Sequence, residues 1–206
     1  YVTAIPRYTS YPTAPQFSEQ YSPDHYRQQA RSSNETLMPR NLSLYEHVPF
    51  CHSLCYFCGC NKVITQAENT QKGNHKVNQY VDNLLYEIDL RSTLFDDDRR
   101  LSQIHFGGGT PNFLNKTQLA EIVERIASRF HLDLPSRLEI GIEIDPRSID
   151  GNGIVKLADI GFNRFSIGVQ DFADNVQRAV NRVQDEGKTL EVIAAASEVS
   201  NSVNVD

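Results

Sequence analysis

All four cysteines of this chain fall within one ten-residue stretch, from Cys51 to Cys60. Cys51, Cys55 and Cys58 are spaced CxxxCxxC, and Cys60 follows two residues after the third of them. Thiolates bind soft metal ions and metal clusters, and so tight a run brings several of them to one place. The stretch therefore predicts a metal-binding loop.

Four explanations of these cysteines compete. Disulfides are disfavoured, because four cysteines so close together cannot staple a chain of 206 residues. A structural zinc site usually draws ligands from two separated segments, although Cys60, His47 and His52 could complete one here. If the four cysteines were buried thiols without a role, all of them would have to fall by chance into less than a twentieth of the chain. An iron–sulfur cluster, which takes thiolates from closely spaced runs, fits best.

A cluster held by three thiolates would differ from a purely structural site. If only three of the cysteines bind a four-iron cluster, one iron keeps an open position for a small molecule. An open position is what separates a reactive metal site from a structural one.

Composition limits the classes of protein that remain. With 206 residues, 39% hydrophobic and 22% charged, the chain is expected to be one soluble globular domain of ordinary size. No apolar run approaches the ~18 residues of a membrane span, and no secretory segment opens the chain. A net charge of −6 argues against general affinity for nucleic acid. Unpaired, clustered thiols suit a reducing cytoplasm.

From residue 42 onward, short β-like runs alternate with helical patterns. The β-like runs are 43–49, 102–107, 138–145, 164–170 and 202–206. Helical spacing of apolar residues runs through 77–88, 119–130, 152–160 and 174–200, with Gly161 ending the third helix and an interruption near Gly187 in the fourth. This alternation predicts an α/β fold, in which helical crossovers join parallel strands. Because the chain stops within the last strand pattern, we expect an incomplete fold.

The predicted strands have one apolar and one polar face. In 138–145, Leu138 and three isoleucines alternate with Glu139, Gly141, Glu143 and Asp145, and the runs at 164–170 and 202–206 alternate in the same way. Parallel strands are normally covered on both faces, and a closed barrel is filled by branched side chains. We therefore expect helices on the apolar face and a large polar ligand on the other. A solvent-exposed face is the alternative.

The candidate polar groups all lie where strands end, and ligands gather at the carboxyl ends of parallel strands. The first strand runs into the cysteines, and the second ends in three consecutive glycines, Gly107 to Gly109. These offer backbone N–H and C=O groups unshielded by side chains. They do not form a P-loop, because no Lys-Ser/Thr follows. Glu143 ends the third strand, although a surface carboxylate would look the same.

The cysteine spacing after a strand resembles the cluster loop of the radical S-adenosylmethionine enzymes. The longer string 45–51, followed by Cys-Tyr-Phe-Cys-Gly-Cys-Asn-Lys at 55–62, resembles one branch of them, the oxygen-independent coproporphyrinogen III oxidases. The strings at 142–146, 166–172 and 180–182 match the same pattern. The resemblance implies a partial (β/α) barrel over 41–206, truncated after about five βα units, with an N-terminal arm over 1–40.

The resemblance also implies cofactors. Cys51, Cys55 and Cys58 would bind a [4Fe–4S] cluster whose fourth iron chelates S-adenosylmethionine, and Cys60 matches a position that is not a ligand. Residues that would contact this first S-adenosylmethionine are Tyr45, Gly108, Gly109 and Thr110, with Glu143 at its ribose. Residues that would line a site for a second one are Phe57, Gln170, Arg182 and Asp206.

Two of these assignments have simpler alternatives. Without the resemblance, Arg182 is equally well interpreted as an exposed charge on the surface of a helix. In the tyrosine-rich string at 6–14, Arg7 would pair with a substrate carboxylate, whereas the simpler reading is an arm lying over the core.

By the same resemblance, a 5′-deoxyadenosyl radical would take a β-hydrogen from a propionate of coproporphyrinogen III. Loss of CO2 and an electron would leave a vinyl group, and two rounds would give protoporphyrinogen IX. We expect a cytoplasmic monomer served by an electron donor that the sequence does not identify, and no catalytic side chain is assigned. The alternatives are a haem-binding or haem-transfer protein of the same superfamily without decarboxylase activity, and a zinc-stabilised binding module.

Overall fold

The computed structural model of this chain describes residues 18, 20–56, 58–65, 74–200 and 202–206. The chain divides into two compact units, residues 1–39 and 40–206. Arg7 and the rest of the string at 6–14 lie outside the described residues. The proposed role of the arm stays a prediction.

The first unit contains one described helix, α1 (Pro23–Ser32), which the apolar spacing does not predict. Its start is set by local chemistry. The Ser22 side chain accepts a hydrogen bond from the His25 backbone N–H, His25 Nδ1 accepts one from the Ser22 N–H, and Pro23 occupies the first turn. Because Ala30 is the one buried residue of α1, the helix carries no apolar stripe for a sequence pattern to reveal.

The second unit is built on a parallel sheet, as the sequence predicts, with six strands where five were predicted. Its strand order is β1 (Leu42–Val48), β4 (Arg100–Gly108), β6 (Glu139–Ile144), β7 (Arg164–Ile167) and β8 (Val203–Val205), with β5 (His131–Leu132) pairing with the start of β4. A second, parallel pair joins β2 (Phe50–Cys51) to β3 (Val63–Ile64). Strands β2, β3 and β5 were not predicted, because two residues are too few to show an alternation.

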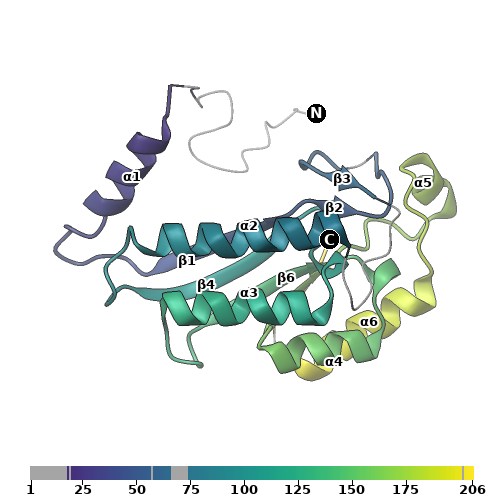
Figure 1. Ribbon diagram of the computed structural model, residues 1–206. Coiled ribbons are helices and arrows are strands. Elements are labelled where there is room, and N and C mark those ends of the chain that lie inside the picture. The colour runs from purple at the N-terminus through teal and green to yellow at the C-terminus, as the bar shows by residue number, and fades with distance from the viewer. Residues whose placement is uncertain (1–17, 19, 57, 66–73, 201) are drawn as a thin grey trace, which may run out of the picture. The chain divides into compact units, whose positions relative to one another are not determined.

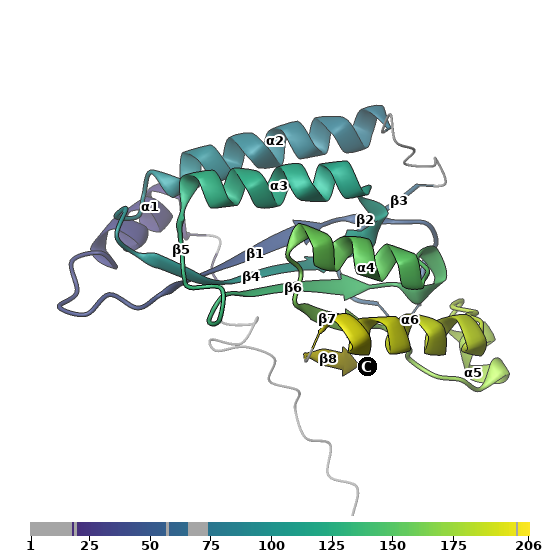
Figure 2. The same ribbon diagram turned by 90° about the horizontal axis from the view of Figure 1, so that it is seen from below.

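Helices connect the strands. They are α2 (His75–Ser92), α3 (Lys116–Arg129), α4 (Gly151–Ile160), α5 (Asp174–Ala179) and α6 (Glu186–Val199), with short 3-10 turns η2 (Pro111–Phe113) and η3 (Pro146–Ser148). Figures 1 and 2 show α2, α3 and α4 along one face of the sheet, with α6 beside α4. As predicted, α4 ends at Gly161, whose φ of 117° is a left-handed conformation that suits glycine.

The predicted interruption of the last helical region exists, but its position near Gly187 is wrong. Helix α5 ends at Ala179 and α6 begins at Glu186, so the break covers 180–185. Gly187 lies inside the first turn of α6, because the Asp185 side chain caps that helix by accepting from the Lys188 backbone N–H at 2.7 Å.

The core lies between the sheet and the helices and confirms the predicted apolar face. Buried strand residues include Ile104, Phe106, Ile140, Ile142, Ile144, Phe165 and Ile167. The helices contribute Val77, Val81, Leu85, Ile88, Leu119, Ile122, Ile126, Ile154, Leu157 and Val192. Burying this contiguous apolar surface is the main favourable term in the folding of the unit.

The opposite face carries a ladder of polar side chains across the strands. Ser43 Oγ donates to Gln103 Oε1 at 2.8 Å, and Gln103 Nε2 donates to Glu139 Oε1 at 2.8 Å. Arg164 extends the ladder from Glu139 to the Ser202 hydroxyl. The polar alternation is thus confirmed, and that a ligand occupies this face stays a prediction.

Within the described part of the chain, no helix combines the length and the apolar character needed to cross a membrane.

One buried carboxyl on the helix-facing side stands out. Glu46 of β1 is 4% exposed. The pKa of this carboxyl rises from 4.5 to about 7, because burial disfavours its charge and the Glu87 carboxylate repels it. Between these two pH values the unfolded chain has released the proton that the folded chain still holds, so the free energy of unfolding falls as pH rises.

We expect Glu46→Gln to be more stable than the parent at pH 7.5, by about 2–3 kcal/mol, because each unit of pKa shift corresponds to about 1.4 kcal/mol. At pH 4 the difference should largely vanish. Urea unfolding of both proteins at the two pH values measures this. Glu124→Gln, which removes an exposed carboxylate from α3, is the control. Parallel pH profiles for the parent and Glu46→Gln would contradict the assignment.

Candidate functional site

A cavity of about 350 Å³ opens at the carboxyl ends of the strands. Predicted site residues that line it are Cys55, Cys58, Gly108, Gly109, Thr110, Glu143, Gln170, Arg182 and Asp206. Gly59, Cys60, Asp145, Ser166 and Gly168 also border it. Because parallel strands share one carboxyl edge, segments far apart in the sequence meet here.

The cysteine loop follows β1 and is tied down at both ends. Cys51 lies in β2, which pairs with β3. Lys62 Nζ donates to the backbone oxygens of Cys58 at 2.9 Å and Cys60 at 3.3 Å. All four cysteines are free, with Cys55 buried, Cys51 and Cys58 half-buried and Cys60 exposed, so the disulfide explanation is excluded.

The middle of the loop is anchored on the segment after α5. The backbone N–H of Tyr56 donates to Val180 O at 2.9 Å, and Asn181 Nδ2 donates to Leu54 O at 2.7 Å. Asn181 has a φ of 55°, a left-handed conformation that asparagine tolerates better than most residues. Two segments more than a hundred residues apart are thereby fixed to each other.

The glycine turn packs directly against the cysteine loop. The Gly109 N–H donates to Val48 O at 2.8 Å. A Cβ on Gly109 would lie 2.8 Å from Pro49 O and 2.9 Å from Cys51 Sγ, closer than a side chain tolerates. Thr110 Oγ1 donates to Cys51 Sγ at 3.5 Å. Burial raises the pKa of the Cys51 thiol, and the hydrogen bond from Thr110 only partly opposes this.

The two histidines that could complete a zinc site make other contacts. Within the described residues, no three His, Cys, Asp or Glu side chains converge on one metal position, and this holds for the three thiolates as well as for a zinc site. His47 is engaged elsewhere, since its Nε2 donates to Asn61 O at 2.9 Å and its Nδ1 lies 3.2 Å from Tyr45 Oη. The His52 ring lies against Phe113, with 4.5 Å between ring centroids. Three thiolates from one short loop beside a cavity fit an iron–sulfur cluster.

Glu143 is oriented at the end of β6. Its Oε2 accepts from the Gly108 N–H at 3.2 Å, and its Oε1 accepts from His105 Nε2 at 3.3 Å. The His105 ring in turn stacks on Tyr45, 6.0 Å between centroids. Burial raises the pKa of Tyr45, and the nearby Glu143 and Cys60 charges raise it further. Tyr45 is exposed, and neither it nor Cys51 is among the residues that line the cavity. His105 was not predicted from the sequence, where its one signal is its place in the second predicted strand.

The exit of β7 brings the residues predicted for a second site together. The N–H groups of Val169 and Gln170 both donate to Asp206 O, at 2.8 and 2.7 Å. Arg182 Nη2 donates to Gly168 O at 2.8 Å. Gln170 has a φ of 67°, which costs a non-glycine residue free energy and is typical of functional turns. Phe57, the fourth predicted member, lies outside the described residues.

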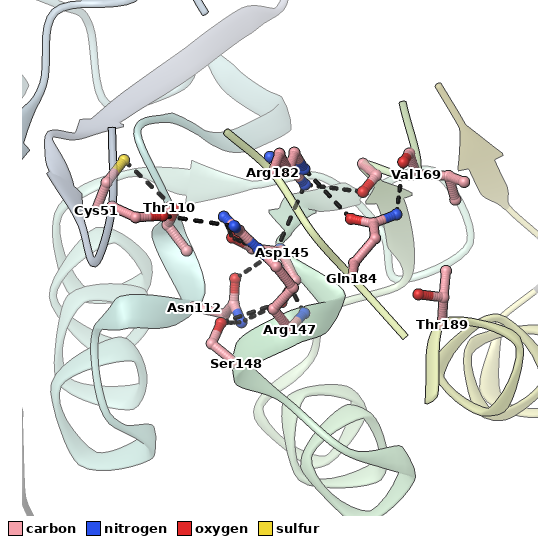
Figure 3. Close-up of polar contacts among 12 residues, drawn as sticks. Cys51, Thr110, Asn112, Asp145, Arg147, Ser148, Val169, Arg182, Gln184 and Thr189 are labelled. Atoms are coloured by element: carbon pink, nitrogen blue, oxygen red, sulfur yellow. Dashed lines mark hydrogen bonds and ion pairs between the residues drawn. The ribbon is translucent and has the colours of Figure 1, made fainter. Parts of the chain in front are cut away.

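Asp145, the last residue of the strand predicted at 138–145, lies at the centre of the polar contacts (Figure 3). Arg147 donates to its carboxylate through Nε at 3.0 Å and Nη2 at 2.7 Å, and Arg182 Nη2 lies 3.7 Å away. Burial opposes ionisation of Asp145, but these two cations outweigh it and lower its pKa below the usual value. No sequence pattern signals this role, because it depends on a residue from a distant segment.

Comparison with known proteins gives consistent matches. The model of the Radical SAM superfamily matches residues 45–205. An oxygen-independent coproporphyrinogen III oxidase of Salmonella typhimurium is 46% identical over 202 residues, covering 98% of this chain and 41% of the relative. One of Mannheimia haemolytica is 47% identical over 141 residues, covering 68% of this chain and 88% of the relative.

Among solved structures, coproporphyrinogen III oxidase from Escherichia coli, described as a radical SAM enzyme, matches with a TM-score of 0.84 and 45% identity. The match covers 97% of this chain and 43% of that one. This chain thus spans about two fifths of the Salmonella and Escherichia relatives. The predicted partial barrel of the radical S-adenosylmethionine type is confirmed.

Gly109→Ala should displace the cysteine loop, because the backbone oxygens that meet the new methyl group cannot swing away. We expect a loss of about 1–3 kcal/mol in the free energy of unfolding and a lower iron content after anaerobic reconstitution. Gly59→Ala, in the same loop but with nothing within 4 Å of the added Cβ, is the matched control. Equal stability and iron content in both variants would show that the contact is not needed.

Proposed function

Because this chain belongs to the radical S-adenosylmethionine superfamily and is homologous to the oxygen-independent coproporphyrinogen III oxidases, we propose that it is the cluster-binding part of such an enzyme. The reaction would be oxidative decarboxylation of two propionates of coproporphyrinogen III to vinyl groups, giving protoporphyrinogen IX. The observation that carries the proposal is a loop of four free cysteines, packed through Cys51 against a glycine turn at a cavity.

Cys51, Cys55 and Cys58 hold a [4Fe–4S] cluster in this proposal. When bound, the cluster supplies the electron that cleaves S-adenosylmethionine and so starts radical chemistry. The chain's own groups keep the loop in place: Thr110 hydrogen-bonds Cys51, and Lys62 holds the backbone around Cys58. Cys60 is exposed, which supports leaving it out of the ligand set.

The cavity wall offers groups that complement the amino group and the ribose of S-adenosylmethionine. Gly108, Gly109 and Thr110 line the cavity, where their backbone and hydroxyl oxygens can accept from the amino group. Tyr45 is assigned to the same ligand by resemblance and does not line the cavity. Glu143 accepts hydrogen bonds, and ribose hydroxyls are natural donors to it. Its orientation by Gly108 N–H and His105 supports this role. A volume of about 350 Å³ lies at the lower end of the range of sites for one small molecule.

A second S-adenosylmethionine is assigned to the β7 exit. Gln170, Arg182 and Asp206 border the same cavity, and Phe57 belongs with them by resemblance. The Arg182 guanidinium is the natural partner of a ligand carboxylate. Its hydrogen bond to Gly168 O supports the assignment, because the bond holds the cation at the cavity.

Anaerobically reconstituted protein should contain about four irons per chain and absorb broadly in the visible range. Substitution of Cys51, Cys55 or Cys58 by alanine should abolish the iron content and the absorption, whereas Cys60→Ala should retain both. Analysis of iron and acid-labile sulfide in each variant measures this. A colourless protein with one zinc would overturn the cluster, and equal loss in Cys60→Ala would overturn the ligand set.

The full-length protein that contains this chain, given S-adenosylmethionine, a reductant and coproporphyrinogen III without oxygen, should release two CO2 per substrate. Glu143→Gln should raise the KM for S-adenosylmethionine by about tenfold or more, since hydrogen bonds to a charged group are lost. Glu139→Gln, on the same strand and face but outside the cavity lining, is the matched control. Haem binding without CO2 release would favour the haem-carrier alternative.

A further inference from the structure

Asp145 joins two arginines, of which Arg182 lines the cavity and Arg147 lies outside its lining (Figure 3). It lines the cavity itself, follows the last residue of β6, and has a side chain only 11% exposed. Arg147 makes a close forked contact with it, and Arg182 forms a looser ion pair at 3.7 Å. Of these three side chains Asp145 and Arg182 line the cavity and Arg147 does not, while Glu143 and Asp206 bring further carboxylates to the lining. Two guanidinium groups and one carboxylate leave one net positive charge on this group of three.

Each arginine is also fixed by a second segment. Arg182 donates to Gly168 O at 2.8 Å and to Gln184 Oε1 at 3.3 Å, which places it at the β7 exit. Arg147 reaches the cysteine loop, with Nη1 3.4 Å from Ser53 Oγ. Asp145 therefore connects the cluster loop with the wall of the second site.

Asp145 is held rigidly enough to act as such a connection. Its backbone N–H donates to Asn112 Oδ1 at 3.0 Å, and its backbone oxygen accepts from Asn112 Nδ2 at 3.3 Å. Its carboxylate also caps η3 by accepting from the Arg147 N–H. A side chain fixed at this many points transmits its position to the groups that pair with it.

We propose that Asp145 is a positioning and specificity-determining residue: it orients Arg182 toward a ligand carboxylate and limits the positive charge of the wall, so that the cavity accepts a ligand whose carboxylate lies beside a sulfonium. This rests on the proposed function. S-adenosylmethionine carries one carboxylate, one ammonium and one sulfonium, hence a net positive charge. S-adenosylhomocysteine lacks the sulfonium charge and is otherwise nearly the same shape.

The charge argument fixes the direction of the effect. Removing the Asp145 charge makes the surroundings of the ligand one charge more positive, which disfavours a net cationic ligand relative to a neutral one. Misorientation of Arg182, in contrast, weakens the binding of both ligands by the same factor, because both carry the same carboxylate. If Asp145 has a purely structural role, its substitution lowers the affinities for both ligands equally. If its charge matters, the substitution lowers the affinity for S-adenosylmethionine more than that for S-adenosylhomocysteine.

The test is anaerobic calorimetric titration of the full-length reconstituted enzyme with S-adenosylmethionine and with S-adenosylhomocysteine. We expect Asp145→Asn to weaken S-adenosylmethionine about tenfold or more, as loss of a supporting residue does, and S-adenosylhomocysteine distinctly less, with iron content unchanged. Asp150→Asn removes a carboxylate that caps α4 and touches neither arginine, and should leave both affinities within about twofold.

Arg147→Gln serves as a second variant, should loss of the Asp145 charge impair folding. It removes a positive charge instead, so the preference for S-adenosylmethionine over S-adenosylhomocysteine should rise. Unchanged preference in both variants would overturn the inference alone, provided that the parent binds S-adenosylmethionine. A parent that binds neither ligand would overturn the proposed function together with it.

Discussion

The close approach of Gly109 to the loop after β1 is the constraint from which the site follows. Parallel pairing of β1 with β4 places Val48 opposite Gly108, so the two chains leave the sheet side by side. The Gly109 N–H then bonds Val48 O, and Pro49 O and Cys51 Sγ occupy the space that a side chain would need. A residue with a Cβ would separate the turn from the thiolate. Backbone packing thus sets where the cysteines stand relative to the cavity.

The cavity is polar because helices cover one face of the sheet and the cavity opens on the other face. Branched apolar side chains of the strands face α2, α3 and α4, and the alternate positions are left small or polar. Near the start of the strands these polar positions satisfy one another, as Gln103 does with Glu139. Toward the carboxyl ends glycines replace long side chains, and space opens for a ligand. The same strands therefore supply both a dry core and a polar pocket.

What the sequence predicts well is what depends on local pattern. Alternation locates the five main strands, helical spacing locates the helices, and Gly161 marks a helix end. Helix α1 escapes prediction because it buries so little, and the break before α6 is misplaced because the cap of Asp185 outweighs the presence of Gly187. The cysteine spacing indicates metal chemistry because the ligands are neighbours in the chain.

Contacts between distant segments lie beyond such reasoning. Nothing in the string around Asp145 shows that Arg182 approaches it, and nothing near Ser53 predicts its contact with Arg147. His105 is likewise ordinary in the sequence and acquires a role only because Glu143 lies on the adjacent strand. Family resemblance supplied the roles of Arg182 and Glu143, whereas the residues that orient them are visible only in the fold.

Two buried carboxyls in this chain show how position decides charge. Asp145 pairs with two arginines, so its pKa is lowered and the charge persists at the cavity. Glu46 is buried beside the acidic Glu87, so its pKa rises to about 7 and the carboxyl keeps its proton in mildly acidic solution. Burial works against ionisation in both cases. The arginines are placed at the carboxyl edge of the sheet, where a fixed negative charge can organise cations around a ligand. On the helix-facing side a charge has no such use and only lowers stability.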